Sequence, residues 1–146
     1  MSRSSLIALT LALTLNADAG SILEEPRFSS PDSRPWVVMV TQPGCSFCSR
    51  LEREILQPLR ASEEFEETVR FTAVDIGVAS PLIDFDGSKT TTVEFANRYQ
   101  GFGTPTLLFL SSDGEVLADP KFGVPDIIDF YAYEIEETIR SLPAIN

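Results

Sequence analysis

The chain has 146 residues, a formal net charge of −11 and no histidine. A strongly acidic protein is a poor ligand for nucleic acid or for an anionic membrane, and its charge keeps it soluble. The absence of histidine excludes a Cys–His protease dyad within one chain. Two cysteines alone are too few for the four ligands of a mononuclear structural zinc site.

The first 19 residues have the pattern of an export signal. Arg3 supplies a positive charge, residues 6–15 form a short apolar stretch, and Ala17-Asp-Ala19 gives the small-x-small pattern that precedes a cleavage site. The apolar stretch is shorter than the about 20 residues that span a bilayer. We therefore expect cleavage between Ala19 and Gly20 and export to the periplasm. A retained N-terminal anchor helix is the alternative.

The remaining chain has the length of one domain. Residues 20–35 contain Pro26, Pro31 and Pro35 among polar residues, which predicts an irregular lead-in. The folded domain is then expected to span residues 36–146.

Hydrophobic patterning predicts a strand followed by a helix at the start of this domain. The apolar run 36–41 is typical of a central strand that is buried on both faces. From Cys45 onward, apolar residues recur at three- and four-residue spacing, which predicts a helix. Pro58 is expected to kink or end that helix after Gln57.

The middle of the domain predicts a second strand and a second helix. Residues 69–76 are rich in β-branched and aromatic side chains, as strands are. Residues 77–90 predict no regular element. Thr91 and Glu94 then have the spacing of a capping box, which indicates the beginning of a helix.

The last third predicts a hairpin and a final helix. The apolar run 106–110, a Ser-Ser-Asp-Gly turn and residues 115–118 form the hairpin. Pro125 is suited to begin the final helix, because proline has a preset φ and lacks an N–H. The element order β-α-β-α-β-β-α implies an α/β fold in which helices cover a mixed central sheet.

The two cysteines, Cys45 and Cys48, form a Cys-x-x-Cys motif between the first strand and its helix. This position places the first sulfur at the mouth of a helix, where unpaired N–H groups and the helix dipole favour a thiolate over a thiol. The thiolate is the species that attacks disulfides. We therefore interpret the pair as a redox-active centre.

Two other uses of the motif stay open. One is a plain structural disulfide, although closing so short a loop removes little chain entropy from the unfolded state. The other is a metal ion or an iron–sulfur cluster bridged between two copies of the chain. We expect neither a metal nor a cofactor.

The predicted order, with a CxxC between the first strand and its helix, resembles the thioredoxin fold from about Trp36 to Leu142. Gly103-Thr-Pro-Thr106 before the hairpin is a second matching element. In thioredoxin-like proteins the proline there is cis and lies beside the CxxC. The resemblance thus implies that Thr104 and Pro105 hold the substrate backbone, and Phe47 is a further candidate for contact with a client.

Longer stretches resemble exported thioredoxin-like proteins of bacteria, including the periplasmic thioredoxins found with sulfur-oxidation systems. These stretches are Gln-Pro-Gly-Cys45-Ser-Phe-Cys48, Ile83-Asp-Phe-Asp-Gly87 and the run from Thr104 to Gly114.

The chain also departs from typical thioredoxins. Its strand before the CxxC, Val37-Val-Met-Val40, lacks the buried acid of cytoplasmic thioredoxins, and Gly44 precedes Cys45 where those proteins have tryptophan. An aromatic second residue between the cysteines is similar to glutaredoxins and disulfide isomerases. A threonine before Pro105 is likewise similar to the periplasmic isomerases.

The resemblance implies a monomeric, exported thiol–disulfide oxidoreductase that acts as a reductase. Cys45 would attack a disulfide in an exported client protein, and Cys48 would resolve the mixed disulfide. A membrane-bound thiol donor would then reduce the pair again, and no nucleic acid would take part. Two alternatives stay open: a disulfide donor or isomerase, and a thioredoxin-fold binding or chaperone module whose cysteines are incidental.

Overall fold

The computed structural model describes residues 27–30 and 32–143. The expected export signal, residues 1–19, and its cleavage site between Ala19 and Gly20 lie outside the described residues and stay predictions.

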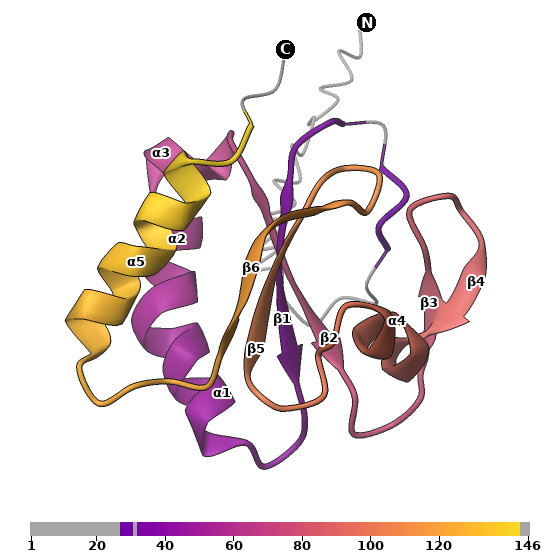
Figure 1. Ribbon diagram of the computed structural model, residues 1–146, viewed down its shortest axis with the longest axis horizontal. Coiled ribbons are helices and arrows are strands. Elements are labelled where there is room, and N and C mark those ends of the chain that lie inside the picture. The colour runs from indigo at the N-terminus through magenta and orange to yellow at the C-terminus, as the bar shows by residue number, and fades with distance from the viewer. Residues whose placement is uncertain (1–26, 31, 144–146) are drawn as a thin grey trace, which may run out of the picture.

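A four-stranded sheet with the order β2-β1-β5-β6 forms the centre of the molecule (Figure 1). β1 (Trp36–Thr41) pairs in parallel with β2 (Arg70–Asp75) and antiparallel with β5 (Thr106–Leu110). β5 also pairs antiparallel with β6 (Val116–Phe122). The sheet is therefore mixed, and the expected α/β fold class is confirmed.

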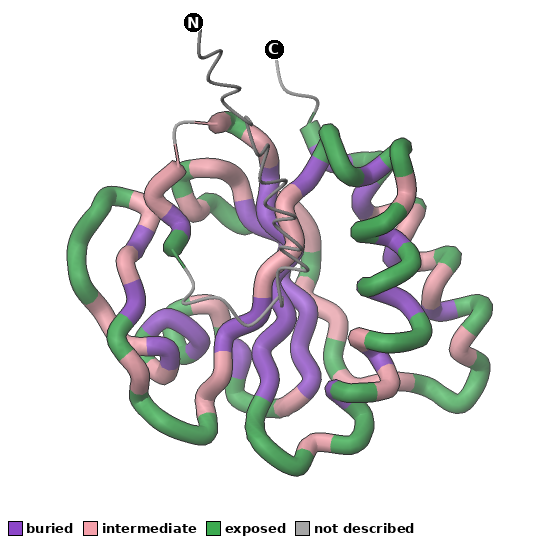
Figure 2. Tube along the Cα trace, turned by 180° about the vertical axis from the view of Figure 1, so that it is seen from behind, coloured by how far each residue is buried: buried purple, intermediate pink, exposed green. Residues whose placement is uncertain are grey.

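The two central strands are the apolar runs of the sequence. Every residue of β1 and β5 is buried, and Figure 2 shows these buried segments in the middle of the molecule. A strand in the middle of a sheet needs apolar side chains on both faces because helices or loops cover both. β6, at the edge, consists of exposed and half-buried residues.

One face of the sheet is covered by the helical segment after β1 and by the final helix α5 (Ile128–Arg140) (Figure 1). That segment consists of α1 (Ser46–Leu51), a π-helical turn η1 (Glu52–Leu56) and α2 (Gln57–Arg60). A short helix α3 (Glu63–Glu66) follows. These helices and the inner side of β1 and β5 form one apolar cluster that contains Cys48.

The expectation that Pro58 ends the helix after Gln57 is wrong, and a kink there stays a prediction. Pro58 lies in the first turn of α2, directly after the π turn, and the helical segment continues to Arg60. Pro58 has no N–H to give to the preceding turn, and the winding changes from π to α directly before it.

The opposite face carries α4 (Thr92–Arg98) and a hairpin of β3 (Pro81–Ile83) and β4 (Lys89–Thr91). The expectation that residues 77–90 are irregular is therefore wrong. Three-residue strands are too short to show a period-2 pattern, so nothing in the sequence marks them. The capping box of Thr91 and Glu94 is confirmed at the beginning of α4.

Part of the segment before β1 belongs to the core on this face. The N–H of Phe28 donates to the carbonyl of Ile83 at 3.0 Å, and the Phe28 side chain is fully buried. Its ring stacks on Phe95 of α4 with centroids 4.4 Å apart.

Two further boundaries differ from expectation. β6 continues to Phe122 rather than ending at residue 118, and α5 begins at Ile128 rather than at Pro125. The N–H of Gly123, a residue with a φ of 69°, donates to the carbonyl of Pro105. This bond continues the pairing of the two strands to Gly123 and leaves Pro125 in the loop that follows.

Candidate active site

The CxxC motif and the Thr104–Pro105 bond lie at the same end of the sheet. β1 ends at Thr41, four residues before Cys45. Val40 pairs with Thr106, the first residue of the antiparallel strand β5. The end of β1, from which the chain continues to Cys45, therefore lies beside the beginning of β5, which follows Pro105.

A turn directs the chain from β1 into α1. Gly44 has a φ of 76°, a conformation that suits glycine, and the N–H of Cys45 donates to the carbonyl of Gln42 at 3.3 Å. The loop after β2 packs on this turn at Gly77, where a Cβ would come within 2.4 Å of Pro43 Cδ. A glycine is therefore needed at position 77 for the two loops to meet.

Cys45 and Cys48 are joined in a disulfide, with an S–S distance of 2.03 Å and Cα atoms 5.2 Å apart. Cys45 is the N-cap residue of α1, and its Sγ accepts a hydrogen bond of 3.1 Å from the N–H of Cys48. Cys45 is half-buried, whereas Cys48 is only 3% exposed. The first sulfur is thus the accessible one, and an N–H is positioned to stabilise negative charge on it.

The Thr104–Pro105 peptide bond is cis, as the resemblance implies. Pro105 is buried and Thr104 is half-buried. The hydroxyl of Thr106 donates to the carbonyl of Gly103 at 2.7 Å, and the N–H of Gly123 donates to the carbonyl of Pro105 at 2.8 Å. These bonds fix the backbone on both sides of the proline.

Three exposed phenylalanines lie on segments of this end of the sheet. Phe47, a sequence candidate, lies between the two cysteines and is exposed. Phe102 precedes Gly103 in the loop that leads to Pro105, and Phe122 pairs with Thr106. The sequence analysis missed Phe102 and Phe122; an aromatic residue directly before each of two glycines is the signal that could have indicated them.

No carboxylate among the described residues is buried on the face of the sheet that holds Cys48 and its apolar cluster. The buried Asp84 belongs to the other face and forms an ion pair of 2.6 Å with Arg98. The titratable side chain that shares the cluster is Tyr131, whose hydroxyl has no hydrogen-bond partner, and burial raises the pKa of Tyr131 to about 12. The lack of an acid in the strand before the CxxC is thus not made up by an acid from another described element.

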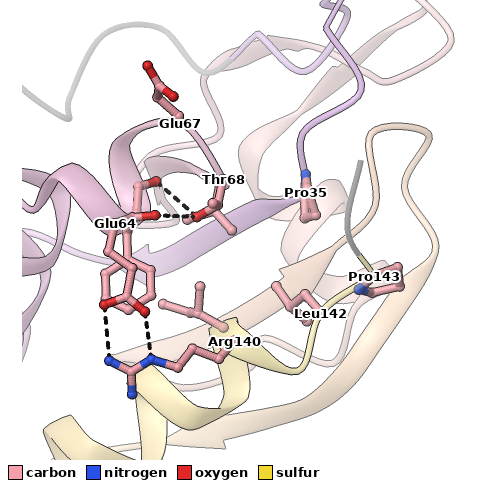
Figure 3. Close-up of a pocket in the computed structure, with 10 residues that line it drawn as sticks. Pro35, Glu64, Glu67, Thr68, Arg140, Leu142 and Pro143 are labelled. Carbon is pink, nitrogen blue, oxygen red and sulfur yellow. Dashed lines mark hydrogen bonds and ion pairs between the residues drawn. The ribbon is translucent and has the colours of Figure 1, made fainter. Parts of the chain in front are cut away.

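A cavity of about 480 Å³ lies away from the disulfide. It is formed by Pro35 at the opposite end of β1, by α3 and by the end of α5. Figure 3 shows Arg140 reaching to Glu64 beside it, and the closest atoms of this ion pair are 2.7 Å apart. Cys45 is half-buried and follows the exposed residues 42–44, so its sulfur lies at the surface, which suits a polypeptide substrate better than a small molecule enclosed in a pocket.

Residues 27–30 and 32–143 contain neither a metal-binding cluster nor a membrane-spanning helix. No group of three or more cysteine or carboxylate side chains is arranged to hold a metal ion. No helix in these ranges has the length and apolar character of a membrane span.

A profile of the thioredoxin-like domain family matches residues 29–125, about two thirds of the chain. The chain belongs to the thioredoxin-like family. The matched range includes the CxxC, the cis-proline and all six strands. A comparison with curated proteins found no match to this thioredoxin-like chain.

Three solved structures are similar to this thioredoxin-like chain at low identity. A thioredoxin-fold protein from Helicobacter pylori is 17% identical, with a TM-score of 0.56 over 81% of this chain and 89% of that one. The oxidoreductase DsbH is 20% identical, with a TM-score of 0.50 over 75% of each chain. The periplasmic thioredoxin SoxS from Paracoccus pantotrophus is also 20% identical, with a TM-score of 0.48 over 73% of this chain and 97% of that one.

Proposed function

We propose that this protein is an exported thiol–disulfide oxidoreductase that reduces disulfides in exported client proteins. The observation that carries the proposal is the asymmetry of the CxxC pair. Cys45 is accessible and accepts an N–H at its sulfur, whereas Cys48 is buried one turn later. Membership of the thioredoxin-like family and the cis-proline at the same end of the sheet support it.

The cycle begins with both cysteines reduced. The Cys45 thiolate attacks one sulfur of a client disulfide; the client's S–S bond breaks, and its second sulfur leaves as a thiolate that takes a proton. Cys48, deprotonated, then attacks Cys45 Sγ and releases the first client sulfur. The client gains two electrons and two protons, and the pair is left as the disulfide of this structure. A thiol donor at the membrane must reduce the pair again.

The backbone near Thr104 and Pro105 would hold an extended client strand beside Cys45. Phe47, Phe102 and Phe122 would contact apolar client side chains, because exposed aromatic rings gain most from burial in an interface. The signal pattern of residues 1–19 supports a periplasmic location, where disulfide exchange is a normal task.

The roles of the two cysteines can be separated by substitution. Cys48→Ser is expected to accumulate mixed disulfides between Cys45 and client proteins, visible as bands that disappear on reduction, because no resolving thiol remains. Cys45→Ser should show neither these bands nor turnover. The double variant Cys45→Ser/Cys48→Ser is the control. Turnover that survives in Cys45→Ser would contradict the mechanism.

The equilibrium reduction potential of the pair tests the direction. A value near thioredoxin's, about −270 mV, is expected for a reductase. A value near that of a strong oxidant, about −120 mV, would instead mean that the protein donates disulfides.

A further inference from the structure

The outer face of α5 carries two aromatic side chains that no other element covers. Phe130 is 60% exposed and Tyr133 is 56% exposed, whereas Tyr131 and Ile135 on the inner face are buried. Residues three apart on a helix are neighbours, so the two rings form one continuous surface. Ile127, the N-cap residue, is also exposed and extends this surface by one turn.

Carboxylates flank the two rings along the chain. Each ring has an acidic residue four positions before it and another four positions after it in the sequence: Asp126, Asp129, Glu134 and Glu137. The cation on α5, Arg140, already forms ion pairs with Glu64, Glu136 and Glu137. Arg140 therefore offsets the charge of Glu137, and Asp126, Asp129 and Glu134 leave the aromatic surface with a negative surround.

This combination has a definite chemical preference. A lysine or arginine side chain lies favourably over an aromatic ring and pairs at the same time with a neighbouring carboxylate. An apolar side chain beside it would remove the exposed rings from water. A second copy of the chain is a poor occupant, because two chains of charge −11 would bring these carboxylates together.

The loop that enters α5 begins beside the cis-proline. Gly123 is hydrogen-bonded to Pro105, and four residues separate it from the first residue of α5. α5 and α1 lie beside each other over the same face of the sheet (Figure 1). A polypeptide bound along the first turns of α5 is thus placed to continue toward Cys45.

We propose that Phe130 and Tyr133, with their four flanking carboxylates, form a docking surface for client polypeptides in which lysine or arginine alternates with apolar residues. The identity of the bound polypeptide as a client rests on the proposed function. The preference of the surface for basic and apolar side chains does not depend on the proposed function.

Binding can be measured without redox chemistry in the full chain carrying Cys45→Ser/Cys48→Ser. The probes are two synthetic peptides of equal length, one of lysine and leucine and one of glutamate and leucine. The basic peptide is expected to bind at least about tenfold more tightly, and Phe130→Ser/Tyr133→Ser should remove about that factor. Val116→Ser, which removes an exposed apolar side chain at the far end of the sheet, is the matched control and should change nothing.

Turnover by the chain with both cysteines present links the surface to function. The same two peptides are made with an internal disulfide, and hydroxyethyl disulfide serves as a substrate too small to reach α5. Phe130→Ser/Tyr133→Ser should lower kcat/KM for the basic peptide by about tenfold and leave hydroxyethyl disulfide unaffected. If none of the disulfides is reduced, the proposed function fails, while the binding measurement still decides the docking proposal.

Several results would overturn the docking proposal. Equal affinity for the basic and acidic peptides would contradict it. An affinity for the basic peptide that Phe130→Ser/Tyr133→Ser leaves unchanged would also contradict it. Self-association of the wild type that this variant abolishes would assign the surface to a second copy. Binding to phosphatidylcholine vesicles that the variant abolishes would assign it to a membrane.

Discussion

The backbone N–H of Gly123 donates a hydrogen bond of 2.8 Å to the carbonyl oxygen of Pro105. It joins the end of β6 to the cis-proline and so connects the entry of α5 with the backbone beside the CxxC. Gly123 has a φ of 69°, in the left-handed region, and a Cβ at this position would meet no atom within 4 Å. The cost of a side chain there is therefore conformational and not steric.

Gly123→Ala is expected to lower the free energy of unfolding by about 1 kcal/mol, because alanine disfavours a positive φ. Urea denaturation of the oxidised protein measures this. Gly103→Ala is the control: its Cβ also meets open space, but its φ lies outside the left-handed region, so stability should hardly change. Equal losses in the two variants would show that backbone conformation at Gly123 is not the cause.

Phe28→Ala is expected to lower the free energy of unfolding by about 3–5 kcal/mol, the usual cost of removing a buried phenylalanine. The Phe28 ring is fully buried and lies 5.1 Å from Trp36 between ring centroids, besides its stacking on Phe95. Phe102→Ala removes an equally large but exposed ring and should cost well under 1 kcal/mol. A small effect of Phe28→Ala would mean that residues 27–30 do not contribute to the core in solution.

Tyr131→Phe is expected to raise the free energy of unfolding at pH 7 by about 1 kcal/mol, because it removes a buried hydroxyl without a partner. Burial raises the pKa of Tyr131 to about 12, above the value of about 10 for a tyrosine in an unfolded chain. Below pH 10 the side chain is neutral in both the folded and the unfolded chain. As the pH rises from 10 to 12, the unfolded chain ionises first, so the free energy of unfolding falls.

The stability difference between Tyr131→Phe and the wild type should consequently widen above pH 10. Urea denaturation at pH 8, 10 and 11 measures this difference, and absorbance at 295 nm follows ionisation of the tyrosine. A difference that stays constant over this range would show that Tyr131 ionises alike in the folded and unfolded chains.

The parts of the fold that could be predicted are those whose signal is local and long. β1 and β5 are uninterrupted apolar runs, and the hydroxyl and carboxylate of the capping box are three residues apart in the sequence. The CxxC pair and the proline of the candidate site could be found because their residue types and their places next to strands are specific. Their catalytic and binding roles stay predictions.

The parts that could not be predicted depend on contacts between distant residues. Leu82 pairs with Thr90 in strands of three residues, which carry no periodicity. Pro125 has the properties of a first helical residue, yet the bond from Gly123 to Pro105 keeps this stretch in a loop. Phe28 lies among prolines and polar residues, and only the folded structure reveals the ring of Phe95 on which it stacks.

The edge strand β6 has consequences for how the protein survives at high concentration. Its pairing with β5 is interrupted by register shifts, Pro120 has no N–H to offer, and Asp119 and Lys121 place charges beside it. An open strand edge is a template on which other chains pair and aggregate, and irregularity, proline and charge all weaken that template. The protein thus presents to other chains an edge that is poorly suited to amyloid-like growth.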